Sequence, residues 1–305
     1  MNFLICGFIY CLFSTNINAK SGLSQDITSS SSRSRVVVFD IDCTLCKPQV
    51  ILDQLENAKK YHPECPIFFW NNVSHVFLPY LQVLFDYLIE HDVRIVFFSF
   101  GDKERNVLVI SQLLTSFWGE VKYEALKTKG QFDIFSMEDT REGIHESEYE
   151  FVKDLKVVLK GPETLSDAIL VEDYRGYVAF DQKPYLQIMD LTFWYIREEN
   201  ERERAEWLYS SYWKRNSPNY HLNSVYFMIG IFKTYFENEK YKILPFRESL
   251  NEILPEKKYY QDFFETHSFA YDMFDLGLSE VQKRVPNATF YGLRHPKVGS
   301  YTSIP

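Results

Sequence analysis

Four short runs of apolar residues predict the strands of a sheet. Each run is four to six residues long and holds at most one charged residue. Continuous apolar runs of this length, without alternation, are typical of strands that are buried on both faces, as in a parallel sheet. The predicted strands are Val36–Phe39, Val93–Phe98, Ala168–Val171 and Tyr185–Ile188.

Segments with helical periodicity lie between these strands. Apolar residues recur there every three or four positions, which is typical of helices with one buried face. Strands that alternate with helices form parallel sheets, so the pattern predicts a Rossmann-like α/β fold with a central parallel sheet flanked by helices. Residues 120–147 show neither period and are expected to be irregular. The predicted helices span residues 79–91, 102–116 and 148–159.

The pattern changes near residue 192, after which no further strand is predicted. Most of the remaining chain has the pattern of aromatic-rich helices, broken near Pro218, Pro245 and Pro255, and the last 20 residues look irregular. We therefore expect four parts. They are a signal peptide (1–19), a Ser-rich linker (20–35), an α/β domain (36–192) and a helical, aromatic-rich C-terminal module (193–305).

The N-terminal apolar run predicts the compartment of the protein. Phe3–Phe13 is too short to span a bilayer, which takes about 20 residues, but it has the length of a signal-peptide core. Small residues precede Lys20, although no Lys or Arg precedes the run. We expect a secreted or periplasmic protein without stable membrane insertion after signal removal. A cytoplasmic protein whose N-terminal segment is frayed or packed in the core is the alternative.

Charge and cysteine content limit the possible ligands. The 305 residues carry a net charge of −9, which disfavours binding to a nucleic acid backbone. Cys43 and Cys46 have C-x-x-C spacing, but a second pair that would complete a zinc site is missing. Their redox state depends on the compartment and stays open at this point.

Polar side chains follow three of the predicted strands, at the point where each strand ends. Ligands of open parallel sheets bind at the carboxyl ends of strands, so these residues are candidates for one site. Carboxylates, a hydroxyl and an amine together suit the transfer of a phosphoryl group: a carboxylate attacks phosphorus, a second one moves protons, and Mg²⁺ and lysine offset the negative charge. The candidates at strand ends are Asp40, Asp42, Ser99, Glu172 and Asp173, and Lys153, shortly before the last pair, supplies the amine.

Three local motifs resemble those of a known enzyme family. Residues 40–44 read D-I-D-C-T and are similar to the D-x-D-x-T signature of haloacid dehalogenase (HAD) superfamily phosphatases. Residues 149–155, Y-E-F-V-K-D-L, resemble the Y-V-K-D-L of the branch that contains the RNA polymerase C-terminal-domain phosphatases. Residues 168–174, A-I-L-V-E-D-Y, resemble its V-I-I-V-D-N-S. The resemblance covers roughly residues 35–190 and does not reach the C-terminal module.

The resemblance implies a catalytic role for five residues. Asp40 is the expected nucleophile and Asp42 the expected general acid and base, with Thr44 orienting Asp42 and the turn. Ser99 takes the place of the second-motif hydroxyl, and Lys153 that of the third-motif lysine. Relative to the family, three residues are inserted before the third strand, so Lys156 or Lys160 is the alternative to Lys153 at this position.

The resemblance also implies a Mg²⁺ site. The expected ligands are Asp40, the backbone carbonyl side of Ile41 or Asp42, and the acidic pair Glu172 and Asp173, of which Asp173 is the expected direct ligand. The pair reads Glu-Asp where the family has Asp-Asn, and Ser99-Phe100 replaces the usual Thr-Ala. These departures affect the expected substrate more than the expected chemistry.

These observations favour a Mg²⁺-dependent phosphatase that forms an aspartyl-phosphate. Only about 48 residues separate Asp42 from the second strand, which leaves little room for a large cap and favours phosphoproteins as substrates. If the C-terminal module acts as a lid, a small phosphomonoester is the alternative substrate. A binding or scaffold protein that has lost catalysis is the other alternative.

Overall fold

The structure, a computed structural model, describes most of the chain between residues 34 and 291. The predicted signal peptide, nearly all of the predicted linker and residues 193–219 of the predicted C-terminal module lie outside the described residues, so the predictions for these segments stay predictions. The described residues are 34–48, 55–56, 59–60, 62–143, 150–182, 185–188, 220–254 and 268–291.

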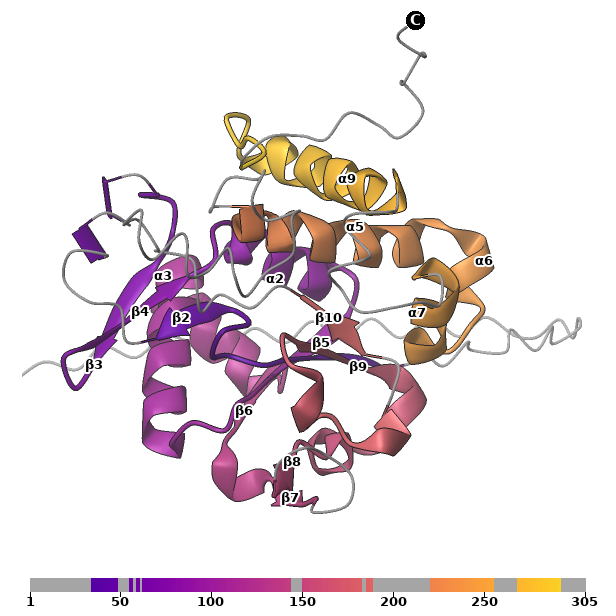
Figure 1. The fold of residues 1–305 in the computed structure, drawn as a ribbon, viewed down its shortest axis with the longest axis horizontal. Coiled ribbons are helices and arrows are strands. Elements are labelled where there is room, and N and C mark those ends of the chain that lie inside the picture. The colour runs from indigo at the N-terminus through magenta and orange to yellow at the C-terminus, as the bar shows by residue number, and fades with distance from the viewer. Residues whose placement is uncertain are drawn as a thin grey trace, which may run out of the picture. The chain divides into compact units, whose positions relative to one another are not determined.

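Five parallel strands form the central sheet (Figure 1). Their order is β10-β9-β1-β5-β6, and each neighbouring pair is parallel. The predicted fold class, a central parallel sheet flanked by helices, is confirmed. The strands are β1 (Arg35–Phe39), β5 (Val93–Phe98), β6 (Phe132–Phe135), β9 (Ala168–Glu172) and β10 (Leu186–Gln187).

The two faces of the sheet are covered by different kinds of element. Val37 and Phe39 of β1 join a cluster with α2 (Leu81–Glu90), α3 (Lys103–Thr128) and α5 (Ser224–Glu237). Val36 and Val38 face the opposite way and pack on short 3₁₀ turns, because successive strand residues point to opposite faces. The 3₁₀ helices are η1 (Met137–Asp139), η2 (Leu155–Val158), η3 (Leu165–Asp167), η4 (Arg175–Tyr177), η5 (Phe180–Gln182) and η7 (Tyr220–Asn223).

Helix α3 is longer than the sequence pattern predicts. It continues through residues 120–128, where we expected irregular chain, and it is interrupted by Gly119 with a φ of 70°. The expectation was wrong because the buried stripe becomes sparse after this glycine, so the last turns lack a clear helical pattern. Strand β6 (Phe132–Phe135) within 120–147 was also missed, because Asp133 leaves only Ile134 and Phe135 as consecutive apolar residues.

The helix predicted over residues 148–159 is absent from the described part of that segment, residues 150–159. Phe151–Val152 form strand β8, which pairs with β7 (Arg141–Glu142), and the 3₁₀ turn η2 follows. The Asp154 carboxylate accepts a hydrogen bond from the backbone N–H of Lys156, which favours a turn over a helix. Apolar residues of this segment are buried, as the pattern indicates, but they lie in a strand and a 3₁₀ turn instead of a helix.

A small antiparallel sheet between β1 and α2 was not predicted. Its order is β2-β4-β3, and the β3–β4 turn at Asn71 and Asn72 has φ values of 47° and 63°. Two consecutive positive φ values are typical of a tight two-residue hairpin turn, and Asn tolerates this conformation well. The strands are β2 (Cys46–Pro48), β3 (Ile67–Trp70) and β4 (Val73–Phe77).

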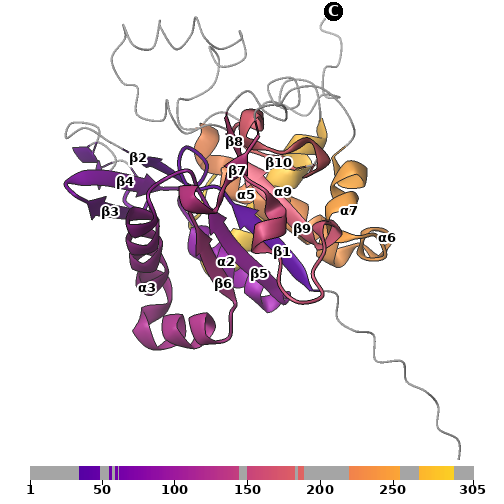
Figure 2. The ribbon, with the colours of Figure 1, turned by 90° about the horizontal axis from the view of Figure 1, so that it is seen from below.

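The described C-terminal helices pack on the sheet face that carries α2. Residues Ser224–Phe232 of α5 are all buried, and α9 lies against α5 on its outer side (Figures 1 and 2). The helical segment breaks near Pro245, as predicted, and Pro245 is the N-cap of α7. Pro218 and Pro255 lie outside the described residues. The remaining helices are α6 (Glu239–Lys242), α7 (Phe246–Ile253) and α9 (Ser268–Arg284).

Two glycines allow α5 and α9 to approach closely. A Cβ placed on Gly230 would overlap the carbonyl group of Met273, and one placed on Gly277 would overlap the carbonyl oxygen of Tyr226. Backbones in such contact leave no space for a side chain. Among the described helices, none has the length and apolar content that a membrane span requires.

Candidate active site

The carboxyl ends of β1, β5 and β9 meet at one edge of the sheet, and each carries predicted site residues. Asp40 and Asp42 follow β1, Ser99 follows β5, and Glu172 ends β9 with Asp173 next. β5 and β6 lie on one side of β1, and β9 and β10 lie on the other. The order of the strands therefore reverses at β1, and in open parallel sheets this is the position at which ligands bind.

Lys153 connects two of these carboxylates. Its Nζ donates a hydrogen bond to Asp40 Oδ1 and another, of 2.6 Å, to Glu172 Oε2. Lys153 and Glu172 are fully buried, and Asp40 is only 4% exposed. The ammonium group also lies 5.3 Å and 5.6 Å from the ring centres of Phe100 and Tyr177, which contributes a favourable cation–π interaction.

The structure distinguishes Lys153 from the two other lysines considered for this position. The backbone N–H of Lys153 donates to the carbonyl of Tyr177 at 3.0 Å, which fixes the chain so that the side chain points to the strand ends. Lys156 is exposed and pairs with Asp181 at 2.7 Å. Lys160 is exposed and pairs with Asp133 at 2.6 Å. Lys153 is therefore the lysine that the fold places at the site.

Burial raises the pKa of Asp40 to about 7. The largest cause is the loss of hydration, and the negative charge of Glu172 adds to it, while Lys153 acts in the opposite direction. For Lys153, burial by itself would lower the pKa, but the adjoining Asp40 and Glu172 carboxylates raise it above its usual value. A single ammonium group therefore does not fully compensate the negative charge at Asp40.

Asp40, Glu172 and Asp173 form a group that fits a divalent cation. One carboxylate oxygen from each lies within 4.8 Å of the others. Hard oxygen ligands of this kind suit Mg²⁺, and the incompletely compensated charge at Asp40 favours a cation there. Both oxygens of Glu172 accept hydrogen bonds, Oε2 from Lys153 and Oε1, at 3.4 Å, from the backbone N–H of Tyr174. Lys153 reaches only Oδ1 of Asp40, and Thr44 reaches only Oδ1 of Asp173. Asp40 and Asp173 are therefore the stronger candidates for direct ligands.

Thr44 is placed differently from its expected role. Its hydroxyl donates to Asp173 Oδ1 at 2.8 Å and accepts from the backbone N–H of Asp173 at 3.1 Å. We had expected Thr44 to orient Asp42. Because Thr44 is fully buried and holds both the side chain and the backbone of Asp173, it positions the acidic pair after β9 instead.

The Asp42 carboxylate lies apart from the cation group and pairs with Arg105. Arg105 donates two hydrogen bonds to it, of 2.7 Å to Oδ1 and 2.5 Å to Oδ2. Ser99 Oγ donates a third, of 2.9 Å, to Oδ2. The expected metal contact of Asp42 is therefore restricted to its backbone carbonyl, because its side chain is absent from the cation group found among the described residues.

Sequence reasoning missed Arg105. It lies in the first turn of α3, which follows β5, and its guanidinium reaches back to the loop after β1. Charged residues are common at the start of exposed helices, so no local pattern distinguishes this arginine from Lys103 or Glu104. Its proximity to the strand end of β5 was the one available signal.

The loop from Asp40 to Cys46 is a tight turn. The carbonyl of Ile41 accepts hydrogen bonds from the backbone N–H groups of Leu45 and Cys46, both at 2.9 Å. Cys43 has a φ of 62°, a conformation that is unusual for a residue with a side chain. Cys43 and Cys46 are not joined by a disulfide in the structure, and burial raises the pKa of Cys46 well above its usual value.

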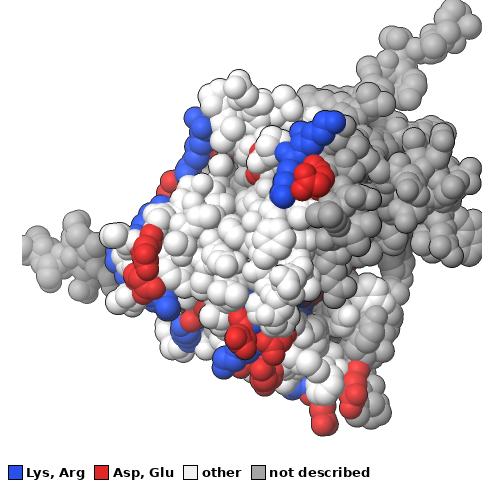
Figure 3. All heavy atoms as spheres, turned by 90° about the vertical axis from the view of Figure 1, so that its left-hand side faces the viewer, with Lys and Arg blue, Asp and Glu red and all other residues white. Residues whose placement is uncertain are grey.

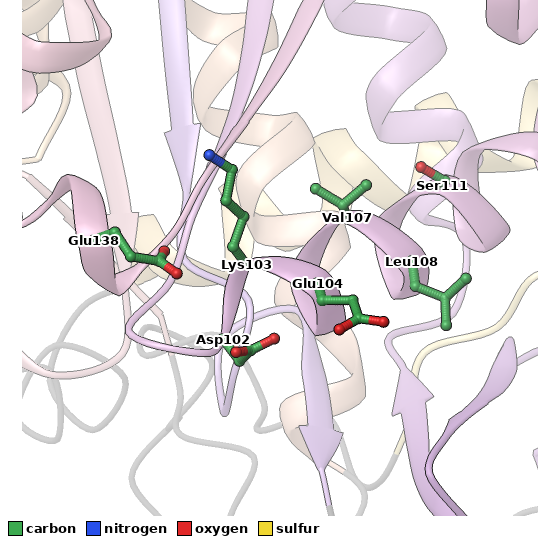
Figure 4. Close-up of a pocket in the computed structure, with 7 residues that line it drawn as sticks. All are labelled: Asp102, Lys103, Glu104, Val107, Leu108, Ser111 and Glu138. Atoms are coloured by element: carbon green, nitrogen blue, oxygen red, sulfur yellow. The ribbon is translucent and has the colours of Figure 1, made fainter.

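An open groove begins at Asp102, the N-cap of α3 (Figure 4). It has a volume of about 580 Å³ and runs along the first turns of α3, where Val107 and Leu108 are each 42% exposed. Glu138 of η1 borders it from the other side. The complete lining is Asp102, Lys103, Glu104, Val107, Leu108, Ser111 and Glu138.

One face of the molecule carries few charged side chains at its centre. Figure 3 shows this face, the left-hand side of Figure 1, where β3, β4 and α3 lie, with Lys, Arg, Asp and Glu mostly toward its margin. Phe69 of the edge strand β3 is 49% exposed. Uncharged surface that is bordered by charge is typical of contact areas between proteins.

Comparison with known proteins gives structural neighbours and no sequence match. No family model and no curated protein matches the chain. A structure of the fission yeast RNA polymerase II CTD phosphatase Fcp1 bound to beryllium fluoride is similar to it, at 14% identity, over 85% of this chain and 68% of that one, with a TM-score of 0.36. A second Fcp1 structure gives the same identity and coverage with a TM-score of 0.35.

Proposed function

We propose that the protein is a Mg²⁺-dependent phosphomonoester hydrolase that works through an aspartyl-phosphate on Asp40. The observation that carries this proposal is the buried arrangement of Asp40, Lys153 and Glu172, with Asp173 beside them at the strand ends. A carboxylate nucleophile with a fixed lysine and a cation site suits attack on a dianionic phosphoryl group.

Each residue of the site has its own role in the proposed reaction. Asp40 attacks phosphorus, and Lys153 holds its carboxylate in position and reduces repulsion from the incoming phosphoryl oxygens. Ser99 offers a hydroxyl for one of those oxygens. Asp42 donates a proton to the leaving oxygen and then takes one from the water that hydrolyses the aspartyl-phosphate. Mg²⁺ held by Asp40 and Asp173 would neutralise charge on the phosphoryl group.

We propose a phosphoprotein as the substrate. The groove on α3 is open and has exposed apolar side chains at Val107 and Leu108, which supports contact with residues next to a phosphorylated side chain. A small phosphomonoester would have no use for this surface. Small-molecule selectivity through a C-terminal lid, and loss of catalysis in favour of binding, are the alternatives that the experiment below separates.

The deciding experiment measures hydrolysis of p-nitrophenyl phosphate and of a phosphopeptide panel, with Mg²⁺ and with excess EDTA. We expect Mg²⁺-dependent activity on both, and a loss of about 10⁴-fold or more in Asp40→Asn, since an amide is a poor nucleophile. Asp92→Asn, at an exposed turn, is the matched control. Hydrolysis of the nitrophenyl ester alone would favour a small-molecule phosphatase. The absence of turnover on every substrate would favour the binding protein.

We also propose export through residues 1–19. The proposal rests on the apolar run Phe3–Phe13 and on the small residues before Lys20. N-terminal sequencing of the native protein should then begin near Lys20. An intact Met1 on a cytosolic protein would reverse the proposed localisation.

A further inference from the structure

Both carboxylate oxygens of Asp42 are occupied in the structure. Arg105 donates to Oδ1 at 2.7 Å and to Oδ2 at 2.5 Å, and Ser99 donates to Oδ2 at 2.9 Å. A general acid and base must present one oxygen to the leaving group. The arrangement therefore describes a resting site, in which Asp42 is held away from proton transfer.

We propose that Arg105 binds the substrate's phosphoryl group and, in moving to it, releases Asp42 for proton transfer. The inference rests on the proposed function and adds to it a phosphate-binding residue that couples substrate binding to the readiness of Asp42. The exchange breaks two hydrogen bonds to a carboxylate and makes new ones to phosphoryl oxygens, with no covalent change.

The location of Arg105 favours this exchange. Its Nη2 lies 3.4 Å from Ser99 Oγ, the hydroxyl that would hold a phosphoryl oxygen. A phosphoryl group at Ser99 would thus lie next to the guanidinium. Arg binds phosphoryl oxygens in the same two-pronged manner as a carboxylate, and a dianion attracts it more strongly than the single charge of Asp42.

The surroundings of Arg105 are built to hold its side chain across the site. A Cβ on Gly101 would overlap the guanidinium, so a glycine at this position provides the space that Arg105 fills. Asn106, 1% exposed, accepts from Arg105 Nε at 3.0 Å. Asn106 is itself fixed by hydrogen bonds of 3.1 Å to the Gly101 carbonyl and to Ser136 Oγ.

The Arg105 guanidinium is shared between two acceptors. Asn106 Oδ1 accepts from Nε at 3.0 Å and from Nη2 at 2.5 Å, and Asp42 accepts from Nη1 and Nη2. The exchange therefore has to break the bonds to Asp42 and can keep the bond from Nε to Asn106, while an oxygen bound at Ser99 would lie beside Nη2.

The first measurement is the affinity of the Mg²⁺-loaded protein for inorganic phosphate, by calorimetry. Loss of charge-assisted hydrogen bonds should weaken phosphate binding by about 10- to 100-fold in Arg105→Gln, with Arg105→Lys in between. Lys129→Ala, which removes an exposed cation from the far end of α3, is the control for general electrostatics. Equal affinity in wild type and Arg105→Gln would overturn the proposal.

A double-mutant cycle tests the exchange itself. Asp42→Ala removes the carboxylate that competes for Arg105, so phosphate should bind several-fold more tightly than to wild type. In the Arg105→Gln background the same change should have little effect, because no arginine is left to release. Equal tightening in both backgrounds would mean simple charge repulsion by Asp42 and would overturn the exchange.

Turnover separates this inference from the proposed function. Phosphate binding needs no catalysis, so the cycle is informative even if the wild type hydrolyses nothing, a result that would contradict the proposed function alone. With an active enzyme, Arg105→Gln should raise KM for p-nitrophenyl phosphate by about the same 10- to 100-fold as it weakens phosphate binding. A variant with lowered kcat and unchanged KM would show that Arg105 only positions Asp42.

Discussion

Lys153 donates a 2.6 Å hydrogen bond to Glu172, and both side chains are fully buried. The same ammonium group holds Asp40, so one lysine connects the strand ends of β1 and β9. Removing one partner of a buried ion pair leaves uncompensated charge in a poorly hydrated place, which destabilises more than the pair itself stabilises. The site and the stability of the sheet are therefore coupled through Lys153.

Lys153→Met should strongly destabilise the protein at neutral pH. The change leaves three carboxylates close together without their cation and should lower the free energy of unfolding by about 3–5 kcal/mol, as measured by urea denaturation without Mg²⁺. At pH 4 the loss should be smaller, because protonation then removes the charge. Lys156→Met removes an exposed lysine from the same turn and should change stability by less than about 0.5 kcal/mol. If the free energy of unfolding falls equally at both pH values, the loss comes from the packing of the Lys153 side chain and not from its charge.

The pKa of Asp40 predicts how the stability of the metal-free protein depends on pH. The folded protein retains a proton on Asp40 up to about pH 7, whereas the ordinary pKa is 3.8. Between these values the folded state binds more protons than the unfolded state, so stability should fall as pH rises from about 4 to about 7 and then level off. Asp40→Asn should flatten this slope in urea denaturation with EDTA.

The control for this prediction is Glu120→Gln, at an exposed position of α3, which should leave the slope unchanged. Mg²⁺ binds the ionised carboxylates, so its addition should restore stability at pH 7.5 in the wild type and much less in Asp40→Asn. An Asp40→Asn protein with the wild-type slope would assign the titration to other groups.

If the groove on α3 binds the substrate, a substitution in it should slow the hydrolysis of large substrates and leave that of small ones unchanged. Leu108→Lys places a charge on the exposed apolar side of the groove and should lower kcat/KM for phosphopeptides by about 10-fold, the scale of one buried apolar contact. Hydrolysis of p-nitrophenyl phosphate should stay at the wild-type rate. Val121→Lys, at an 88% exposed position of the same helix, is the matched control. Equal losses on both substrates would place Leu108 in the catalytic geometry instead.

The sequence predicted the residues at strand ends, and the family resemblance added Lys153, but Arg105 was missed. Asp40, Ser99 and Glu172 each adjoin a buried apolar run, and parallel strands bring their ends together whatever the loops do. Arg105 reaches the site from a helix, so its role depends on the packing of α3 and leaves no local signal. Thr44 was placed near the site correctly, but its partner Asp173 follows another strand and could not be predicted from spacing.

Secondary structure was predicted best where burial decides it. The apolar runs that form β1, β5 and β9 are almost fully buried, so their apolar composition matches their buried environment. The segment 150–159 has helical spacing and folds otherwise, because strand pairing and side-chain hydrogen bonds after β8 override it. The short strands β2, β3 and β4 include exposed or polar positions and have too few residues for a clear period.

The close contact between α5 and α9 gives the last prediction, which concerns the C-terminal helices. A Cβ on Gly277 would overlap the Tyr226 carbonyl oxygen, and backbone cannot move aside as a flexible side chain can. Gly277→Ala should therefore separate the helices and lower the free energy of unfolding by about 1–3 kcal/mol, although Ala is the better helix former.

Because α5 shares one hydrophobic cluster with β1 and α2, this loss should appear in the unfolding of the whole described core, as a single transition at a lower midpoint. Ser279→Ala, at an exposed position of α9, makes a smaller gain in helix propensity without the overlap and should leave the midpoint unchanged or slightly raised. Two transitions in Gly277→Ala, with the activity lost only in the second, would show that α5 and α9 unfold as a separate unit. The C-terminal helices would then be a docked module, which favours a partner-binding role for them.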